Sequence, residues 1–177
     1  MTRKYFSLLL AIGLLLCFFS CAPPRERVEG GISMDGIYEG MSYDELKSVV
    51  PEDKLISIQY EYSCFMDEWG NTVLVCLTED YQTVKKIEIF EKQLRSKRYL
   101  EKHLKEDMTV SEVLALAGIP TRTVGYGVIR TEFPTASKNV TLRIEWYNGS
   151  EYGGQGIRGE LRVAHFEFYD AEANILL

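Results

Sequence analysis

Two segments of the chain, 67 residues apart, carry the same signal for the start of a helix. Residues 39–46 read EGMSYDEL and residues 106–113 read EDMTVSEV. In each segment, Ser or Thr stands at the N-cap and Glu follows three residues later, which is the pattern of a capping box. A Met directly before the cap and an apolar residue directly after the Glu form a hydrophobic staple. Because residues alternating between apolar and polar follow both segments, the sequence predicts two tandem units of a helix plus an antiparallel meander.

The two predicted helices end at proline or glycine. The first stops at about Val50, before Pro51. The second stops at Ala117, because Gly118 suits a left-handed C-cap and Pro120 cannot continue the helix. The residues expected to be buried are Leu46, Val49 and Val50 in the first helix, and Val110, Val113, Leu114 and Ala117 in the second.

The strands are predicted from alternation. The first unit, residues 34–92, has expected strands at 58–66, 73–77 and 84–90, and the second, residues 93–177, has them at 124–131, 140–147 and 161–169. Residues 91–106 are charged with a thin apolar stripe, which favours a helix that links the units and opens the second. The expected fold class is α+β, and units of this size are marginal alone, so we expect them to pack together.

The pairing of Cys64 and Cys76 depends on the turn at Gly70 and Asn71. A two-residue loop pairs Cys64 with Leu77 and sends the two thiols to opposite faces, since a one-residue slip flips every side chain. A three-residue loop places them opposite each other. The two-residue loop has the cleaner apolar face and favours free thiols, while a disulfide remains the alternative.

The N-terminus predicts export. Arg3 and Lys4 precede an apolar run over 8–19, and Ser20 is a small residue at the expected cut. Residues 18–21 (FFSC) resemble a bacterial lipobox, so residues 1–20 are expected to be a signal peptide and Cys21 to carry lipid. The alternative is an uncleaved anchor, because residues 5–22 are uncharged. Residues 21–33 contain proline and glycine and are predicted to be a flexible tether.

Composition indicates a packed domain without a nucleic-acid partner. Hydrophobic residues make up 46% of the chain, and the net charge of −6 supplies no basic face. His103 and His165 have no neighbouring metal ligands, and no phosphate loop or nucleophile motif is present. We therefore expect no catalytic residue, metal or cofactor.

A family resemblance rests on the duplicated segments. Residues 107–120 (DMTVSEVLALAGIP), with 144–147 (IEWY) beyond them and Gly40 to Ser42 in the first unit, resemble the repeat of the SmpA/OmlA lipoproteins of β-barrel assembly and of the β-lactamase inhibitory proteins. The resemblance covers about residues 36–177. The second unit departs from it by carrying Asp107 where the motif has Gly, and the first lacks the Gly-x-Pro ending. The resemblance implies protein binding through a sheet face and loops, with no shared catalytic site.

The predicted binding surface is the solvent face of the second sheet. Aromatic residues mixed with Arg are enriched in interface hot spots, and the alternative is an ordinary solvated sheet face. The core side of the last strand is expected to hold Ala164, Phe166 and Phe168. The candidate binding residues are Arg143, Glu145, Tyr147, His165, Glu167 and Tyr169 on the strands, with Tyr152 and Arg158 in the glycine-rich loop between them.

The sequence thus predicts a lipoprotein that is held on a membrane by Cys21 and binds an unidentified envelope protein. Ala22 favours the outer membrane if the cell has two membranes, and otherwise the outer face of the cell membrane is expected. The resemblance implies a role in envelope or outer-membrane assembly. The alternatives are inhibition of a secreted enzyme such as a β-lactamase, and a small envelope hydrolase without a recognisable motif.

Overall fold

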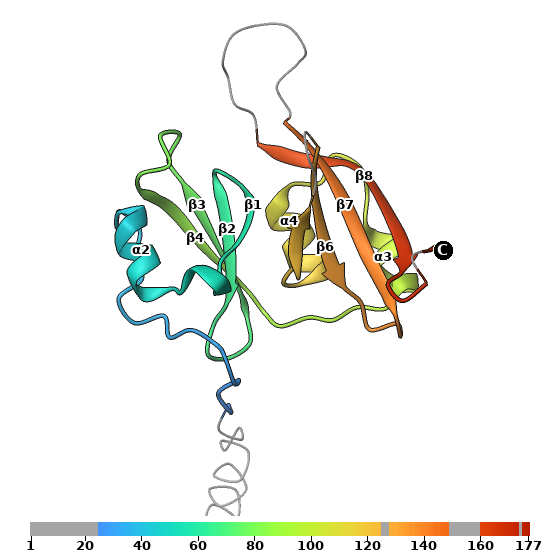
Figure 1. Ribbon diagram of the computed structural model, residues 1–177, viewed down its shortest axis with the longest axis horizontal. Helices are drawn as coiled ribbons and strands as arrows, with labels where there is room; N and C mark the ends of the chain where they lie inside the picture. Colours follow the sequence, from blue (N-terminus) through green and yellow to red (C-terminus); the bar gives the residue numbers. More distant parts are fainter. Residues whose placement is uncertain (1–24, 125–127, 149–159, 174) are drawn as a thin grey trace, which may run out of the picture.

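The computed structural model describes residues 25–124, 128–148, 160–173 and 175–177. They form the predicted α+β fold, with helices α2 (Tyr43–Val49), α3 (Lys97–His103) and α4 (Val110–Ala117), a short 3-10 helix η1 (Glu52–Lys54) and two antiparallel sheets (Figure 1). The predicted signal peptide and Cys21 lie outside the described residues.

Each sheet is a meander in which consecutive strands pair. The first contains β1 (Ile56–Gln59), β2 (Tyr62–Met66), β3 (Thr72–Leu77) and β4 (Val84–Phe90), in that order. The second contains β5 (Arg122–Val124), β6 (Ile129–Pro134), β7 (Val140–Asn148), β8 (Leu161–Asp170) and β9 (Ile175–Leu176), also in order.

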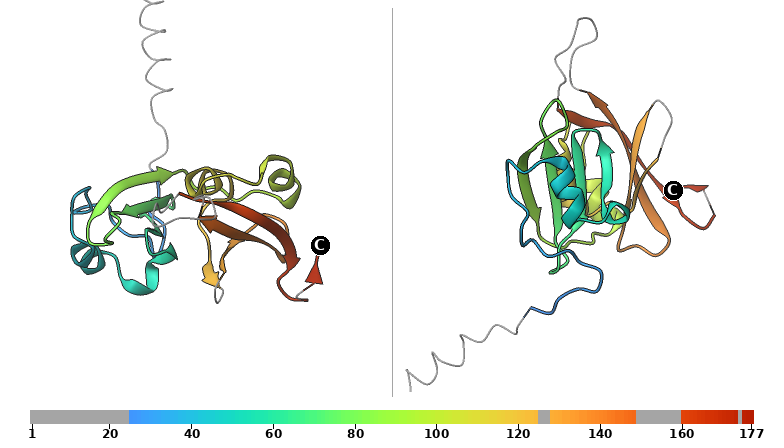
Figure 2. Two further views of the ribbon diagram at one scale, coloured as in Figure 1. Left: turned by 90° about the horizontal axis from the view of Figure 1, so that it is seen from above. Right: turned by 60° about the vertical axis from the view of Figure 1, so that its left-hand side comes forward.

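The elements stack in alternating layers of helix and sheet (Figures 1 and 2). Helix α2 covers one face of the first sheet in a core that includes Leu46, Phe65 and Val75. The other face, with Cys64 and Leu74, shares a larger core with α3, α4 and the second sheet. The two parts therefore pack together, as their small size leads one to expect. Helix α4 lies between the two sheets, and α3 packs beside α4 over the second sheet (Figures 1 and 2).

Both predicted capping boxes are present. Ser42 N donates to Glu45 at 2.7 Å and Thr109 N donates to Glu112 at 2.8 Å, while each N-cap side chain accepts from the Glu backbone in return. These hydrogen bonds hold the pKa of both Glu carboxyls below the ordinary value. The predicted buried residues are buried in both helices, except that Val49 is exposed.

The chain before each capped helix bonds to the last long strand of the following sheet. In the first part, Gly40 N donates to Val84 O at 2.8 Å and Val84 N donates to Met41 O at 2.9 Å. In the second, Asp107 N donates to Val163 O and Val163 N to Met108 O, both at 2.9 Å. Each helix start is thereby fixed to its own sheet edge.

Three of the predicted elements are shorter than expected. The strand expected over 58–66 is a hairpin of β1 and β2 that turns at Tyr60 and Glu61, and the strand expected over 124–131 is divided between β5 and β6. The helix expected over 91–106 is confined to α3, which begins after its N-cap Ser96. Apolar alternation that continues across a turn does not mark the turn, which explains why the turn at Tyr60 and Glu61 was missed.

The predicted register of the β2–β3 hairpin is wrong. Cys64 lies opposite Leu74 and Cys76 lies opposite Tyr62, so the two cysteines share a face as diagonal neighbours. Such neighbours are about 7–8 Å apart, which is longer than a relaxed disulfide accepts. Both thiols are free, as favoured from the sequence, but for a different geometric reason.

Gly118 ends α4 with a positive φ, although not in the predicted left-handed helical region. Its φ of 77° and ψ of −151° lie where essentially only glycine is found. A Cβ atom at this position would stand 2.4 Å from the Gln93 carbonyl oxygen. Glycine is required here both by the backbone conformation and by the close approach of the linker before α3.

Candidate functional site

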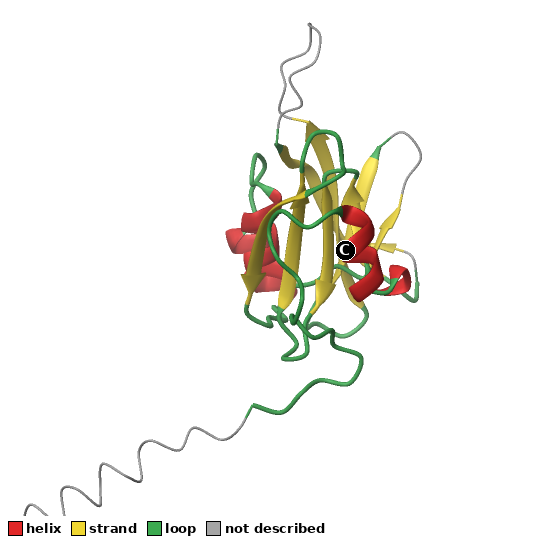
Figure 3. Ribbon diagram, turned by 90° about the vertical axis from the view of Figure 1, so that its left-hand side faces the viewer, coloured by secondary structure: helices red, strands yellow, loops and turns green. Residues whose placement is uncertain are grey.

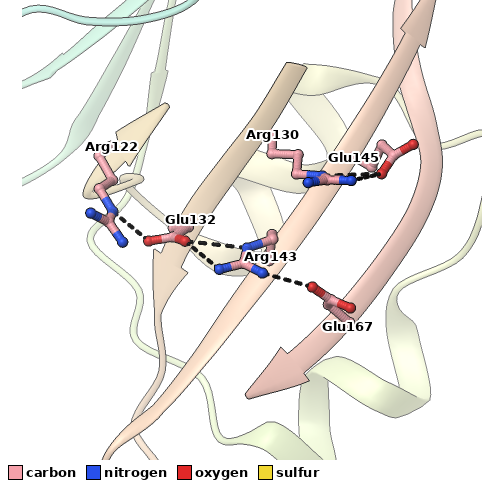
Figure 4. Close-up of polar contacts among 6 residues, drawn as sticks. All are labelled: Arg122, Arg130, Glu132, Arg143, Glu145 and Glu167. Atoms are coloured by element: carbon pink, nitrogen blue, oxygen red, sulfur yellow. Dashed lines mark hydrogen bonds and ion pairs between the residues drawn. The ribbon is translucent and has the colours of Figure 1, made fainter. Parts of the chain in front are cut away.

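The face of the second sheet that points away from α3 and α4, here called the outer face, carries a charged network (Figure 4). The helices lie on the opposite face, and no helix of the described residues covers this one (Figure 2). Side chains alternate along each strand, so Phe133, Leu142 and Ile144 enter the core while their neighbours point outward.

Two rows of directly opposed residues cross the outer face. The first row contains Arg122 of β5, Glu132 of β6, Arg143 of β7 and Glu167 of β8, and the second contains Arg130 of β6, Glu145 of β7 and His165 of β8. Cross-strand neighbours of opposite charge stabilise a sheet. The register therefore sets positive and negative side chains in alternation across the sheet.

Glu132 is the centre of the first row. It accepts from Arg122 Nε at 2.6 Å and from Arg143 Nη2 at 2.9 Å, and Arg143 Nη1 donates onward to Glu167 at 2.9 Å. The Glu132 residue is only 3% exposed. Burial by itself raises the pKa of Glu132, but the hydrogen bonds from its partners outweigh it and bring the pKa below the ordinary value.

The second row is more open to solvent. Arg130 Nε and Nη2 each lie 3.2 Å from the same Glu145 oxygen. Together with Arg143, Glu167 and His165, this pair lines a small hollow of about 120 Å³. Ion pairs in such surroundings contribute little stability, so the second row is better placed to exchange its partners on binding.

The end of β7 is tied to the segment before α4. The Tyr147 hydroxyl donates to the Asp107 carboxylate, and Arg162 Nη1 donates to the Asp107 carbonyl at 2.7 Å. The bond to Asp107 raises the pKa of the Tyr147 phenol. Asp107 itself has a φ of 66°, in the left-handed region that Asp tolerates better than most residues.

Six of the eight candidate residues lie on the outer face, namely Arg143, Glu145, Tyr147, His165, Glu167 and Tyr169. Tyr169 lies beneath the Arg143 guanidinium, 4.4 Å from its ring centroid, and is 7% exposed, so it presents little surface to a partner. Tyr152 and Arg158 lie outside the described residues. Ala164 was expected in the core, but it is the extra residue of a β-bulge and is only partly buried.

Sequence reasoning missed three members of the network, Arg122, Arg130 and Glu132. A signal for two of them was present, because Ile129, Thr131 and Phe133 alternate with Arg130 and Glu132 as a one-sided strand does. The prediction of one strand over 124–131 cut that alternation before Glu132. Arg122 lies in a three-residue strand whose position follows only from its pairing with β6.

Other chemistry-bearing residues are accounted for by local structure. His103 Nδ1 lies 2.8 Å from Tyr99 O, and its ring stacks on that of Tyr99 at 4.1 Å. Burial raises the pKa of the Cys64 thiol to about 12 and that of Cys76 to about 11, so both are protonated at neutral pH. Over the described ranges, no group of His, Cys, Asp and Glu side chains is arranged to hold a metal ion.

Comparisons with known proteins leave the class of this chain open. No protein-family model, no curated protein and no solved structure matches it. Within the part of the chain that the structure describes, no helix is long and apolar enough to cross a membrane.

Proposed function

We propose that this protein is a membrane-anchored lipoprotein of the cell envelope that binds another protein through the outer face of its second sheet. The observation that carries the proposal is this open sheet face, on which ion pairs hold charged side chains from four strands in fixed positions. Side chains that are already ordered lose less conformational entropy on association. The proposed anchor is lipid on Cys21, which rests on the sequence of the N-terminus.

A tandem arrangement of two related units is part of this proposal. It is supported by the matching capping boxes and by the matching bonds that tie Met41 and Met108 to the last long strand of each sheet. A finer correspondence adds weight, since Tyr38 N donates to Met41 Sδ at 3.4 Å and Lys105 N donates to Met108 Sδ at 3.3 Å. These four residues stand at the same 67-residue offset as the capping boxes. The resemblance to the SmpA/OmlA repeat suggests envelope assembly as the process served.

Photocrosslinking in cells tests the binding face. A photoreactive residue at His165, which is exposed on the outer face, is expected to form an adduct with one envelope protein. The same residue at Val49, exposed on α2 at the opposite side of the molecule, should not form that adduct. Equal adducts from both positions, or none from either, would contradict the proposal.

A charge-swapped pair supplies a matched variant. Arg130→Glu combined with Glu145→Arg keeps an ion pair between β6 and β7 but reverses its direction. The doubly substituted protein should fold and reach the membrane as before, yet lose the His165 adduct because the charge pattern no longer complements the partner. Retention of the adduct would show that these charges play no part in recognition.

A further inference from the structure

The chain that follows Cys21 is attached to one end of the protein. Val28 N donates to Glu68 O at 2.8 Å, Ile32 N donates to Met66 O at 3.0 Å and Glu68 N donates back to Ile32 O at 2.9 Å. Residues 28–32 of the expected tether are therefore fixed against the β2–β3 turn. The attachment is close, because a Cβ on Gly31 would stand 2.3 Å from the Asp67 carbonyl oxygen.

The β2–β3 turn is itself held by a buried carboxylate. Asp67, at 2% exposure, accepts from Trp69 N at 2.9 Å, from Asn71 N at 2.7 Å and from Asn71 Nδ2 at 2.9 Å. Gly70 in the same turn lies against Val28, with 3.0 Å between its Cβ position and a Val28 methyl. The attached chain and the turn therefore form one fixed surface.

Trp69 projects from this surface. It is 36% exposed, whereas the other tryptophan, Trp146, is 4% exposed and donates to Thr131 at 2.8 Å in the core. The Arg27 guanidinium lies 5.7 Å from the Trp69 ring centroid and pairs with Glu68 at 3.1 Å. An exposed tryptophan with an apolar ring and one N–H donor suits the boundary between lipid and water.

We infer that the β2–β3 turn is the membrane-facing end of the protein and that Trp69 sits among the lipid headgroups. This inference rests on the proposed lipidation of Cys21. Seven residue steps separate Cys21 from Val28, and a fully extended chain covers at most about 25 Å over that length. A lipid on Cys21 thus holds the turn within reach of the bilayer surface.

The charges around Trp69 indicate which lipids are needed. The neighbouring basic residues Arg25, Arg27 and Lys92 stand among the acidic residues Glu26, Glu68 and Glu91. Because these charges balance, the contact depends on the aromatic ring and does not require anionic lipid. Phosphatidylcholine vesicles are therefore a sufficient membrane for the test.

The inferred orientation sets the direction in which the outer face points. The strands of both sheets extend, in alternating directions, between the end where the N-terminal segment joins and the opposite end (Figures 1 and 3). The outer face therefore stands upright beside the membrane. A partner would then be met side-on, in the plane of the membrane. The β1–β2 turn, with Tyr60 at 77% exposure, lies at the other end of β2 and faces away from the lipid.

Fluorescence quenching by brominated lipid tests the orientation. Lipidated protein is purified from membranes and reconstituted into phosphatidylcholine vesicles with bromine near the headgroup end of the acyl chains. The emission of Trp69 is obtained as the difference in fluorescence between the natural protein and Trp69→Phe. We expect this emission to be lost in the brominated vesicles. Trp146 should be unaffected, because it is enclosed in the core.

A displaced tryptophan provides the control. In Trp69→Phe combined with Tyr60→Trp, the new emission should survive in brominated vesicles. No quenching of Trp69 in protein that floats with the vesicles, or equal quenching at position 60, overturns the inferred orientation and leaves the lipid anchor standing. Protein whose mass shows no acyl group on Cys21 instead overturns the proposed lipid anchor, and the inference with it.

Discussion

Replacing Glu132 is expected to weaken the folded state more than any other single change on the outer face. Its carboxylate is nearly buried and accepts from Arg122 and Arg143, so Glu132→Ala removes both interactions at once. The matched control is Glu145→Gln, which loosens only the more exposed pair with Arg130.

The magnitude follows from the exposure of each partner. The Arg122 side chain is 63% exposed, so water screens its ion pair with Glu132 and losing it adds little to the cost. The Arg143 side chain is 26% exposed, and its hydrogen bonds to an ionised acceptor contribute about 1.5–3 kcal/mol. Arg143 keeps Glu167 and the Tyr169 ring, which offsets part of the loss. We expect Glu132→Ala to cost about 2–3 kcal/mol and lower Tm by about 4–12 °C.

The pH dependence distinguishes the ion pairs from simple packing. Because the folded pKa of Glu132 lies below its ordinary value, its contribution is present above about pH 4.5 and is lost as pH falls through the folded pKa. Urea unfolding of the natural protein and Glu132→Gln should therefore differ by about 1 kcal/mol at pH 7 and converge in acid. Two results would refute this reasoning. One is a cost of Glu132→Ala below about 0.5 kcal/mol. The other is a difference in unfolding free energy between the natural protein and Glu132→Gln that grows as the pH falls.

Two further predictions concern the glycines and the thiols. Gly118→Ala should cost at least about 2–3 kcal/mol in urea unfolding, because it combines a glycine-only backbone with a clash at the Gln93 carbonyl. Gly40→Ala, whose Cβ meets nothing within 4 Å, should cost only about 1 kcal/mol. Equal costs for the two variants would contradict the steric argument. In the folded protein at pH 8, a thiol reagent should modify Cys76 slowly and Cys64 more slowly still, because their pKa values are about 11 and about 12. Rapid labelling of Cys64 without denaturant would show that its burial is incomplete.

Local signals allowed the starts of α2 and α4 to be predicted to the residue, whereas the start of α3 and the strand pairing were predicted less well. A capping box is contained in four consecutive residues, and both Ser42 and Thr109 make the expected bonds. The β2–β3 register depends instead on a five-residue turn, residues 67–71, which is held by hydrogen bonds to the Asp67 carboxylate. The presence of Gly70 and Asn71 does not indicate the length of that turn. Registers are long-range properties, and hydrophobic alternation fixes them only where one face alone is apolar.

That condition fails in the first sheet, because both of its faces are covered. Phe65 and Val75 pack against the core beside α2, while Cys64 and Leu74 pack against the core shared with α4. A strand buried on both sides has no polar face by which its register can be read. The second sheet has one open face, and there the inward and outward residues of β7 were predicted correctly through Trp146 and Tyr147, whereas the prediction for β8 failed at its bulge residue Ala164.

Asp107 shows what the motif in the two helix-start segments constrains. Gly40 has a φ of 91° in the first segment, and Asp107 has a φ of 66° at the corresponding place in the second. The shared requirement is therefore a backbone with positive φ, which glycine meets without strain and Asp meets at some cost. In the second segment this cost is accompanied by a bond from Tyr147 to the Asp107 carboxylate, which glycine could not accept. Asp107, where the chain departs from the motif, thus links the turn before α4 to the end of β7 through its bond with Tyr147. This link lies beside the face proposed to bind the partner.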